Sequence, residues 1–257
     1  MKRISALLLL CCMIVSVSCN NGPRCSIVSH RGFWNCEDGG MSQNSIAALK
    51  AAQDNGFWGS ECDVHLTADG EIIVNHDPTI DGLAIADTTY SELSGHLLPN
   101  GEKRPTLDEY LSQAEKSKTV LVLEFKAQAD DAHEDELVDK SIACLKEHGL
   151  YKPKRVAFIS FSHHICLKLA AEAPEFKNQY LNGDIAPEFL HAEGINGIDY
   201  HYGVILNHPE WVAQAHSYGM DVNVWTVDDT EVALQLLELG VDAITTNVPK
   251  EISALLR

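Results

Sequence analysis

Short apolar runs alternate with longer amphipathic stretches from about residue 26 to the end of the chain. A short apolar run that is bounded by turn residues predicts a buried strand, whereas apolar residues that recur every three or four positions predict a helix. The predicted strands cover residues 26–29, 57–63, 119–125, 156–160, 179–181, 197–200, 221–225 and 243–245. The helices predicted to follow them cover residues 44–55, 106–111, 134–148, 164–173, 187–193, 209–218, 230–239 and 249–256.

These eight strand–helix pairs favour a single closed barrel. Alternating strands and helices require a mostly parallel sheet that is covered by helices, and eight units favour an α/β fold of the TIM (β/α)8 type over an open sheet. The chain has 257 residues, of which 45% are hydrophobic, which suffices for one such domain. Residues 78–105 are irregular and too short for an insertion domain. We therefore expect one domain over residues 25–257, with small loops and no large cap.

Reactive side chains follow the first two predicted strands. Working residues of such barrels lie at the carboxyl ends of the strands, and His30 and Arg31 directly follow the first one. Glu61 and Asp63 are two positions apart in an extended segment, so they point to the same side. A tight turn then returns the chain to His76, which we expect near both acids.

A third acid, Glu124, lies near the end of the almost wholly apolar strand 119–125. A carboxylate there is costly to bury unless it is paired or coordinates a cation. An ion pair with Lys126 is the simpler interpretation, although both residues lie on one face and could serve one site. Two imidazoles, a guanidinium and several carboxylates are the groups required for metal-assisted attack on a phosphodiester.

The ordered motifs make the chain similar to glycerophosphodiester phosphodiesterases over almost all of its length after residue 25. The matching segments are His30-Arg31-Gly32, Gln43-Asn44-Ser45, Glu61-Cys62-Asp63-Val64, Thr67-x-Asp69-Gly70, His76-Asp77, Leu123-Glu124-Phe125-Lys126, Val224-Trp225-Thr226-Val227 and the segment 240–249.

The resemblance implies a TIM barrel and one divalent cation on Glu61, Asp63 and Glu124. It also implies acid–base roles for His30 and His76, in an order that the sequence leaves open.

Further implications concern the phosphate and the substrate. Arg31 and Lys126 match the positions expected to hold the phosphate, and ligation by oxygen alone suits Mg²⁺ or Ca²⁺. Trp225 either fills the barrel mouth or forms a flat wall for the glycerol or the departing alcohol. The chain departs from the family pattern at Gln43 and Asn247, where a glutamate and an aspartate are usual.

The resulting hypothesis is metal-dependent hydrolysis of a small-molecule glycerophosphodiester to glycerol 3-phosphate and an alcohol. Attack by a neighbouring glycerol hydroxyl through a cyclic phosphate and attack by an activated water both fit these residues. The alternatives are a phospholipase that cleaves inositol or lyso lipids, and a lipoprotein that binds phosphodiesters without turnover. The net charge of −18 argues against a nucleic-acid partner, because phosphate backbones would be repelled.

The first eighteen residues predict a secretory signal peptide. Lys2 and Arg3 precede an apolar run over residues 6–17, which is too short to span a bilayer comfortably. Small residues at 16–18 precede Cys19, and residues 19–24 form a short predicted tether. We expect export, either to a bacterial periplasm after plain signal cleavage or as a membrane-anchored lipoprotein through a lipidated Cys19.

Five cysteines remain after the signal segment and Cys19 are set aside. This odd number, without a Cys-x-x-Cys pair, argues against a dense disulfide framework or a zinc–thiolate site. A disulfide between Cys25 and Cys36 stays open. Cys62, Cys144 and Cys166 lie in apolar patterns that are typical of small core residues.

Replacement of Cys19 tests the predicted lipid anchor. If Cys19 is the acylated first residue of the mature protein, Cys19→Ala should move the protein from the detergent phase to the aqueous phase in a phase-partitioning assay. A water-soluble mature protein that carries an unmodified Cys19 would show plain signal cleavage instead.

Overall fold

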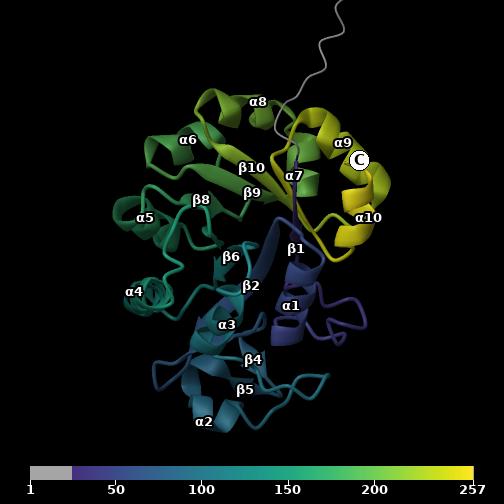
Figure 1. Ribbon diagram of the computed structural model, residues 1–257. Helices are drawn as coiled ribbons and strands as arrows, with labels where there is room; N and C mark the ends of the chain where they lie inside the picture. The colour runs from purple at the N-terminus through teal and green to yellow at the C-terminus, as the bar shows by residue number, and fades with distance from the viewer. Residues whose placement is uncertain (1–24, 257) are drawn as a thin grey trace, which may run out of the picture.

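Eight parallel strands form a closed ring in the computed structural model, which describes residues 25–256 (Figure 1). The ring closes because β1 pairs with both β2 and β11. In order around the ring, the strands are β1 (Ser26–Ser29), β2 (Gly59–Leu66), β6 (Val120–Phe125), β7 (Val156–Ser160), β8 (Lys177–Tyr180), β9 (Gly197–His201), β10 (Asp221–Trp225) and β11 (Ala243–Thr246). The predicted single-domain TIM barrel is therefore confirmed. The predicted signal peptide, the tether and Cys19 lie outside the described residues.

Helices cover the outside of the strands, as Figure 1 shows for the green and yellow half of the chain. They are α1 (Ile46–Asp54), α3 (Leu107–Ala114), α4 (Asp131–Glu147), α5 (His163–Glu172), α6 (Pro187–Ala192), α7 (Tyr202–Asn207), α8 (Glu210–Ser217), α9 (Thr230–Leu239) and α10 (Pro249–Ala254). Thr106 begins α3 with a reciprocal capping box that includes Glu109, which satisfies backbone groups at the helix start.

Helices α4 and α7 differ from the prediction for identifiable reasons. Helix α4 begins at Asp131 and not at residue 134, because the Asp130 side chain accepts a hydrogen bond from the His133 backbone and caps an earlier turn. The short α7 follows β9 directly and has too few residues to show a helical period in the sequence.

The segment between β2 and α3 is small. Strand β3 (Ile72–Val74) pairs antiparallel with β2, which confirms the predicted turn. A two-stranded hairpin of β4 (Thr79–Ile80) and β5 (Leu83–Ala84), the short helix η1 (Ile85–Asp87) and α2 (Tyr90–Leu93) follow. Ile80, Ile85 and Leu93 bury their side chains against Ile73, so this segment has its own small core and forms no large cap.

Small and medium apolar side chains fill the barrel interior. Val28, Val122, Ala157, Ile159, Leu181 and Ala243 form one buried cluster, and they come from β1, β6, β7, the end of β8 and β11. Branched and small residues of this kind fill the interior of such barrels and exclude water below the strand ends. Polar side chains at those ends therefore lie next to an apolar interior that excludes water.

No described helix is long and apolar enough to cross a membrane. The five cysteines within residues 25–256 are all free, so the disulfide between Cys25 and Cys36 that the sequence left open does not form.

Candidate active site

Three carboxylates meet at the ends of two neighbouring strands. Glu61 and Asp63 lie two residues apart on β2, and Glu124 on β6 is the register partner of Asp63. All three side chains are buried, and a set of their carboxylate oxygens lies within 4.8 Å of one another. The structure thus brings together the three acids to which the sequence assigned a cation.

The burial of these acids changes their protonation. Burial, together with the charges of Asp63 and Glu124, raises the pKa of Glu61 well above its usual range. Burial and the charge of Asp63 raise the pKa of Glu124 to about 7. The pKa of Asp63 is lowered despite burial, because Lys126 and a hydrogen bond from Asn44 stabilise its charged form. Without a cation, the cluster therefore holds one firmly ionised carboxylate and two that retain protons more readily.

The remaining contacts of the cluster leave room for a cation. The backbone N–H of Arg31 donates to Glu61 Oε2 at 2.6 Å, and Asn44 Nδ2 donates to Asp63 Oδ2 at 2.8 Å. Glu61 Oε1 is buried and accepts no hydrogen bond from residues 25–256. Carboxylate oxygens are the ligands that Mg²⁺ and Ca²⁺ prefer, so the residues present fit such an ion.

Lys126 lies beside the carboxylates. Its Nζ atom is 2.6 Å from Glu124 Oε1 and 3.3 Å from Asp63 Oδ1, so the ion pair that the sequence offered as the simpler interpretation does form. Although burial opposes it, the charges of Glu124 and Asp63 raise the pKa of Lys126 and keep it an ammonium. Lys126 lines neither of the two cavities at this end of the barrel, in contrast to the other predicted phosphate ligand, Arg31.

Two adjoining cavities open at the strand ends. The first has a volume of about 200 Å³, and its walls include His30, Arg31, Glu61, His76, Glu124 and Trp225. The second has a volume of about 260 Å³ and shares Arg31 and His76 with the first. A molecule that occupied both cavities would pass beside this guanidinium and this imidazole.

His30 is held as a neutral ring. It follows β1, and its Nδ1 atom lies 2.9 Å from the side-chain oxygen of Asn247, which follows the adjacent strand β11. Burial, and next the charge of Arg31, lower the pKa of His30 to about 4. Asn247 supplies a hydrogen bond but no charge, so it offsets these two effects only in part.

His76 lies in the loop after β3 and is more exposed than His30. Its Nδ1 atom is 2.8 Å from Asp77 Oδ1, and the ring lines both cavities. A carboxylate at this distance fixes the ring orientation. The two predicted histidines therefore line the same cavity. A side-chain amide orients the His30 ring, and a carboxylate orients the His76 ring.

A sharp bend after β1 positions Arg31. Arg31 and Gly32 both have left-handed backbone conformations, with φ values of 56° and 80°. A Cβ atom on Gly32 would lie 2.6 Å from the Cβ of Ala48 in α1, so only glycine allows this close approach. The Arg31 Nη1 atom donates to Gln43 Oε1 at 2.7 Å, and its Nε atom is 3.8 Å from Asp63 Oδ2. Gln43 therefore orients the guanidinium without adding a fourth carboxylate.

Trp225 lies at the mouth of the barrel, between its apolar interior and the first cavity. Its ring packs on the apolar cluster inside the barrel and also forms a wall of the first cavity. Its Nε1 atom donates to the Asp199 carbonyl oxygen at 2.9 Å, and Phe161 packs edge-on against it at 5.5 Å between ring centroids. These contacts hold a flat apolar surface in place beside the polar groups.

Sequence reasoning missed Asp199, which lines the first cavity from β9. Its Oδ2 atom accepts from Asn223 Nδ2 at 2.9 Å, whereas its buried Oδ1 atom has no partner among the described residues. Burial, and next the charge of Glu124, raise the pKa of Asp199 well above its usual range. The available signal is an acid inside the predicted strand 197–200.

Known proteins share this fold and this sequence pattern. The model of the glycerophosphoryl diester phosphodiesterase family matches residues 30–251. A glycerophosphodiester phosphodiesterase of Caldanaerobacter subterraneus subsp. tengcongensis is 28% identical over 248 residues, which cover 90% of this chain and 97% of that protein.

Solved structures are similar as well. A glycerophosphodiester phosphodiesterase from Parabacteroides distasonis is 40% identical with a TM-score of 0.87, and the match covers 91% of this chain and 97% of that one. An Oleispira antarctica phosphodiesterase, solved in complex with the product sn-glycerol-3-phosphate, is 24% identical with a TM-score of 0.76, and the match covers 89% of this chain and 95% of that one. The chain therefore belongs to the glycerophosphoryl diester phosphodiesterase family and is a phosphoric diester hydrolase.

Proposed function

We propose that this enzyme uses one divalent cation and two histidines to hydrolyse small glycerophosphodiesters to glycerol 3-phosphate and an alcohol. The observation that carries the proposal is the convergence of Glu61, Asp63 and Glu124 within 4.8 Å, beside a cavity that His30 and His76 also line. When bound, Mg²⁺ or Ca²⁺ would neutralise phosphate charge and make a coordinated hydroxyl or water more acidic.

Arg31 is the residue best placed to bind the phosphate. It lines both cavities, so a diester whose two arms occupy one cavity each would present its phosphate to the guanidinium. Gln43 fixes one terminal nitrogen, which leaves the other available for a phosphate oxygen. Lys126 contributes from further away, since its ammonium offsets the charge of Asp63 and Glu124.

His30 is assigned the role of general base. A base must be unprotonated before it reacts, and a pKa of about 4 keeps this imidazole neutral near pH 7. Asn247 occupies Nδ1, which leaves Nε2 for the proton of the attacking hydroxyl or water. The same residue serves both the cyclic route and direct attack by water.

His76 is assigned the role of general acid. The Asp77 carboxylate engages Nδ1 and orients the ring, which leaves the other nitrogen to deliver a proton to the departing alkoxide. Each histidine would contribute on the order of 10²–10⁴ in rate, the usual range for general acid–base catalysis.

The first cavity suits the glycerol moiety. Its volume is about 200 Å³, and its walls combine charged and polar side chains with the aromatic rings of Trp225 and Phe161. The similar Oleispira antarctica enzyme was solved with sn-glycerol-3-phosphate, which supports a glycerol 3-phosphate half as the recognised part of the substrate. The alcohol would then occupy the second cavity, whose walls include the polar side chains of Asn75, Asp77 and Arg104.

The two rival functions find less support. A phospholipase needs exposed apolar loops to reach lipid, but in residues 78–105 only Leu83 and Leu97 expose large apolar side chains, at 38% and 54%. A binding protein without turnover needs no neutral base, whereas His30 is buried and held neutral beside the carboxylates.

A substrate panel tests the proposed activity. We expect release of glycerol 3-phosphate from the choline, ethanolamine, glycerol and inositol diesters, because all four share the glycerol 3-phosphate half that the first cavity would bind. EDTA should abolish release, and added Mg²⁺ or Ca²⁺ should restore it. Cleavage of long-chain phosphatidylinositol alone would favour the phospholipase, and undiminished turnover in EDTA would contradict the role of the cation.

Single substitutions separate proton transfer from cation binding. His30→Ala and His76→Ala should each lower kcat by about 10²–10⁴ and leave the affinity for Mn²⁺ almost unchanged, because carboxylates and not imidazoles bind the ion. Glu61→Gln should weaken Mn²⁺ binding, measured by calorimetry. His96→Ala is the matched control, since His96 pairs with Asp81 but lines neither cavity, and its kcat should equal that of the wild type. Wild-type turnover in His30→Ala would refute the assignment.

Asn247→Asp tests why His30 stays neutral. A carboxylate in place of the amide at 2.9 Å favours the imidazolium, so the pKa of His30 should rise by roughly 1–3 from about 4. The acidic limb of kcat/KM should then move to higher pH, because a larger fraction of the base is protonated at a given pH. Asn247→Ala removes the hydrogen bond without adding charge and should not move the limb upward. An acidic limb that is identical in wild type and Asn247→Asp would show that His30 is not the base.

A further inference from the structure

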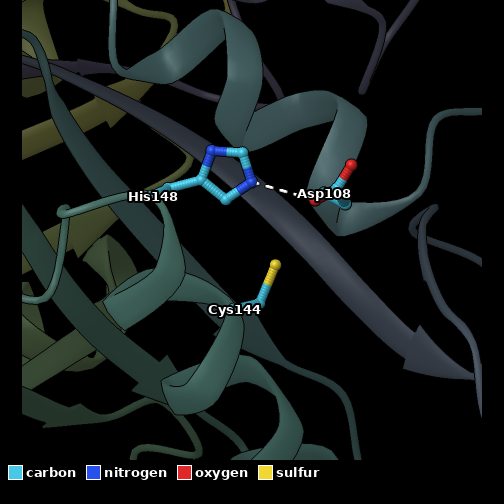
Figure 2. Close-up of side chains that lie close together, drawn as sticks. All are labelled: Asp108, Cys144 and His148. Carbon is cyan, nitrogen blue, oxygen red and sulfur yellow. Dashed lines mark hydrogen bonds and ion pairs between the residues drawn. The ribbon is translucent and has the colours of Figure 1, made fainter.

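A second group of possible metal ligands lies on the outside of the barrel, where α3 meets α4 (Figure 2). Asp108 is in the first turn of α3, Cys144 is near the end of α4, and His148 caps the end of α4. One ligand atom from each of the three residues lies within 4.8 Å of the other two. None of the three residues lines the cavities of the active site.

The spacing of the residues explains the convergence. Cys144 and His148 are four positions apart at the end of α4, which places both side chains on one face. Asp108 comes from the neighbouring helix, and its Oδ1 atom is 3.0 Å from His148 Nε2. Figure 2 shows the Cys144 sulfur pointing toward the imidazole and the carboxylate. Cys144 packs against the apolar core, in line with the prediction from the sequence, but it is only partly buried.

A fourth residue supports His148 in the manner of a metal-bound histidine. The Nδ1 atom lies 3.4 Å from Glu115 Oε2, while Nε2 faces Asp108. Histidines that bind a metal almost always donate the other ring N–H to a carboxylate or carbonyl, which fixes the tautomer and the ring orientation. The His148 side chain is only 14% exposed, so the ring is already held in this orientation.

Other histidine–carboxylate groups in this acidic protein lack these features. The comparable group of Asp131, Glu134 and His164 contains no thiol. In that group, Glu134 already accepts hydrogen bonds from the Gln128 backbone and from Ser162 Oγ, at 3.3 and 2.6 Å, so both of its oxygens are engaged. Cys144, in contrast, is a free cysteine that supplies a thiol to its group.

We propose that Asp108, Cys144 and His148 bind a zinc-type divalent ion that joins α3 to α4, with Glu115 as the residue that orients His148. Sulfur, nitrogen and one carboxylate oxygen suit Zn²⁺, which binds such mixed donors tetrahedrally, whereas Mg²⁺ and Ca²⁺ prefer oxygen alone. On binding, the Cys144 thiol transfers its proton to solvent and its sulfur bonds to the metal. The fourth position is left for water. This site uses one cysteine, whereas the cysteine count and the lack of a Cys-x-x-Cys pair weigh against zinc sites built from several.

Cobalt distinguishes this site from the active site, because only a thiolate ligand gives a near-ultraviolet sulfur-to-cobalt charge-transfer band. The purified mature protein, reduced with a phosphine to keep thiols free without supplying one, should develop this band when titrated with Co²⁺. Cys144→Ser should abolish the band and leave turnover of glycerophosphodiesters unchanged. Cys25→Ser is the matched control, since Cys25 is a partly buried free cysteine outside all the metal-ligand groups of residues 25–256, and it should keep the band.

Zinc affinity tests the orienting residue. Glu115→Gln should weaken binding of Zn²⁺ by about 10- to 100-fold in competition with a chromogenic chelator, the usual cost of losing such a partner, while the cobalt band remains at saturating metal. His148→Ala should lose both the cobalt band and the binding of Zn²⁺. Circular dichroism would confirm that each variant is folded. No band in the wild type, or a band that persists in Cys144→Ser, would overturn the proposal.

Discussion

The site depends on one constraint, namely that three carboxylates are buried in contact at the ends of β2 and β6. Like charges at this distance in a poorly solvated site cannot all remain ionised without compensation. Lys126 and Asn44 compensate Asp63, and the pKa values of Glu61 and Glu124 rise because their compensation is incomplete. A divalent cation would complete it. The parallel register of the two strands fixes this arrangement, since it places Asp63 directly beside Glu124.

The two departures from the family pattern limit how much negative charge surrounds that cluster. Gln43 binds Arg31 and Asn247 binds His30, each through a side-chain amide oxygen. An acid at either position would add charge to a site that already holds three carboxylates. The amide at 247 leaves His30 neutral and ready to accept a proton, while the guanidinium of Arg31 stays positioned for phosphate. We therefore interpret both substitutions as compatible with catalysis.

Much of the fold and of the site could be predicted from the sequence, whereas the remaining features depend on how distant segments pack. Strands β1, β7 and β10 have the predicted bounds because their apolar runs are short and end at turn residues. The convergence of Glu61, Asp63 and Glu124 followed from strand order and alternation. The hydrogen bond between His30 and Asn247 joins residues 217 positions apart, and the group of Asp108, Cys144 and His148 depends on the packing of α3 against α4, so no local pattern reveals either.

Anomalous diffraction from crystals soaked in Mn²⁺ would test the central claim most directly, because this ion replaces Mg²⁺ at oxygen ligands and is located by its own scattering. We predict one strong peak bounded by Glu61, Asp63 and Glu124 and next to the cavity that His30 and His76 line. A manganese peak elsewhere on the protein and no peak between these three carboxylates would contradict the account. Lys126 and bound protons would then balance the carboxylates without a cation.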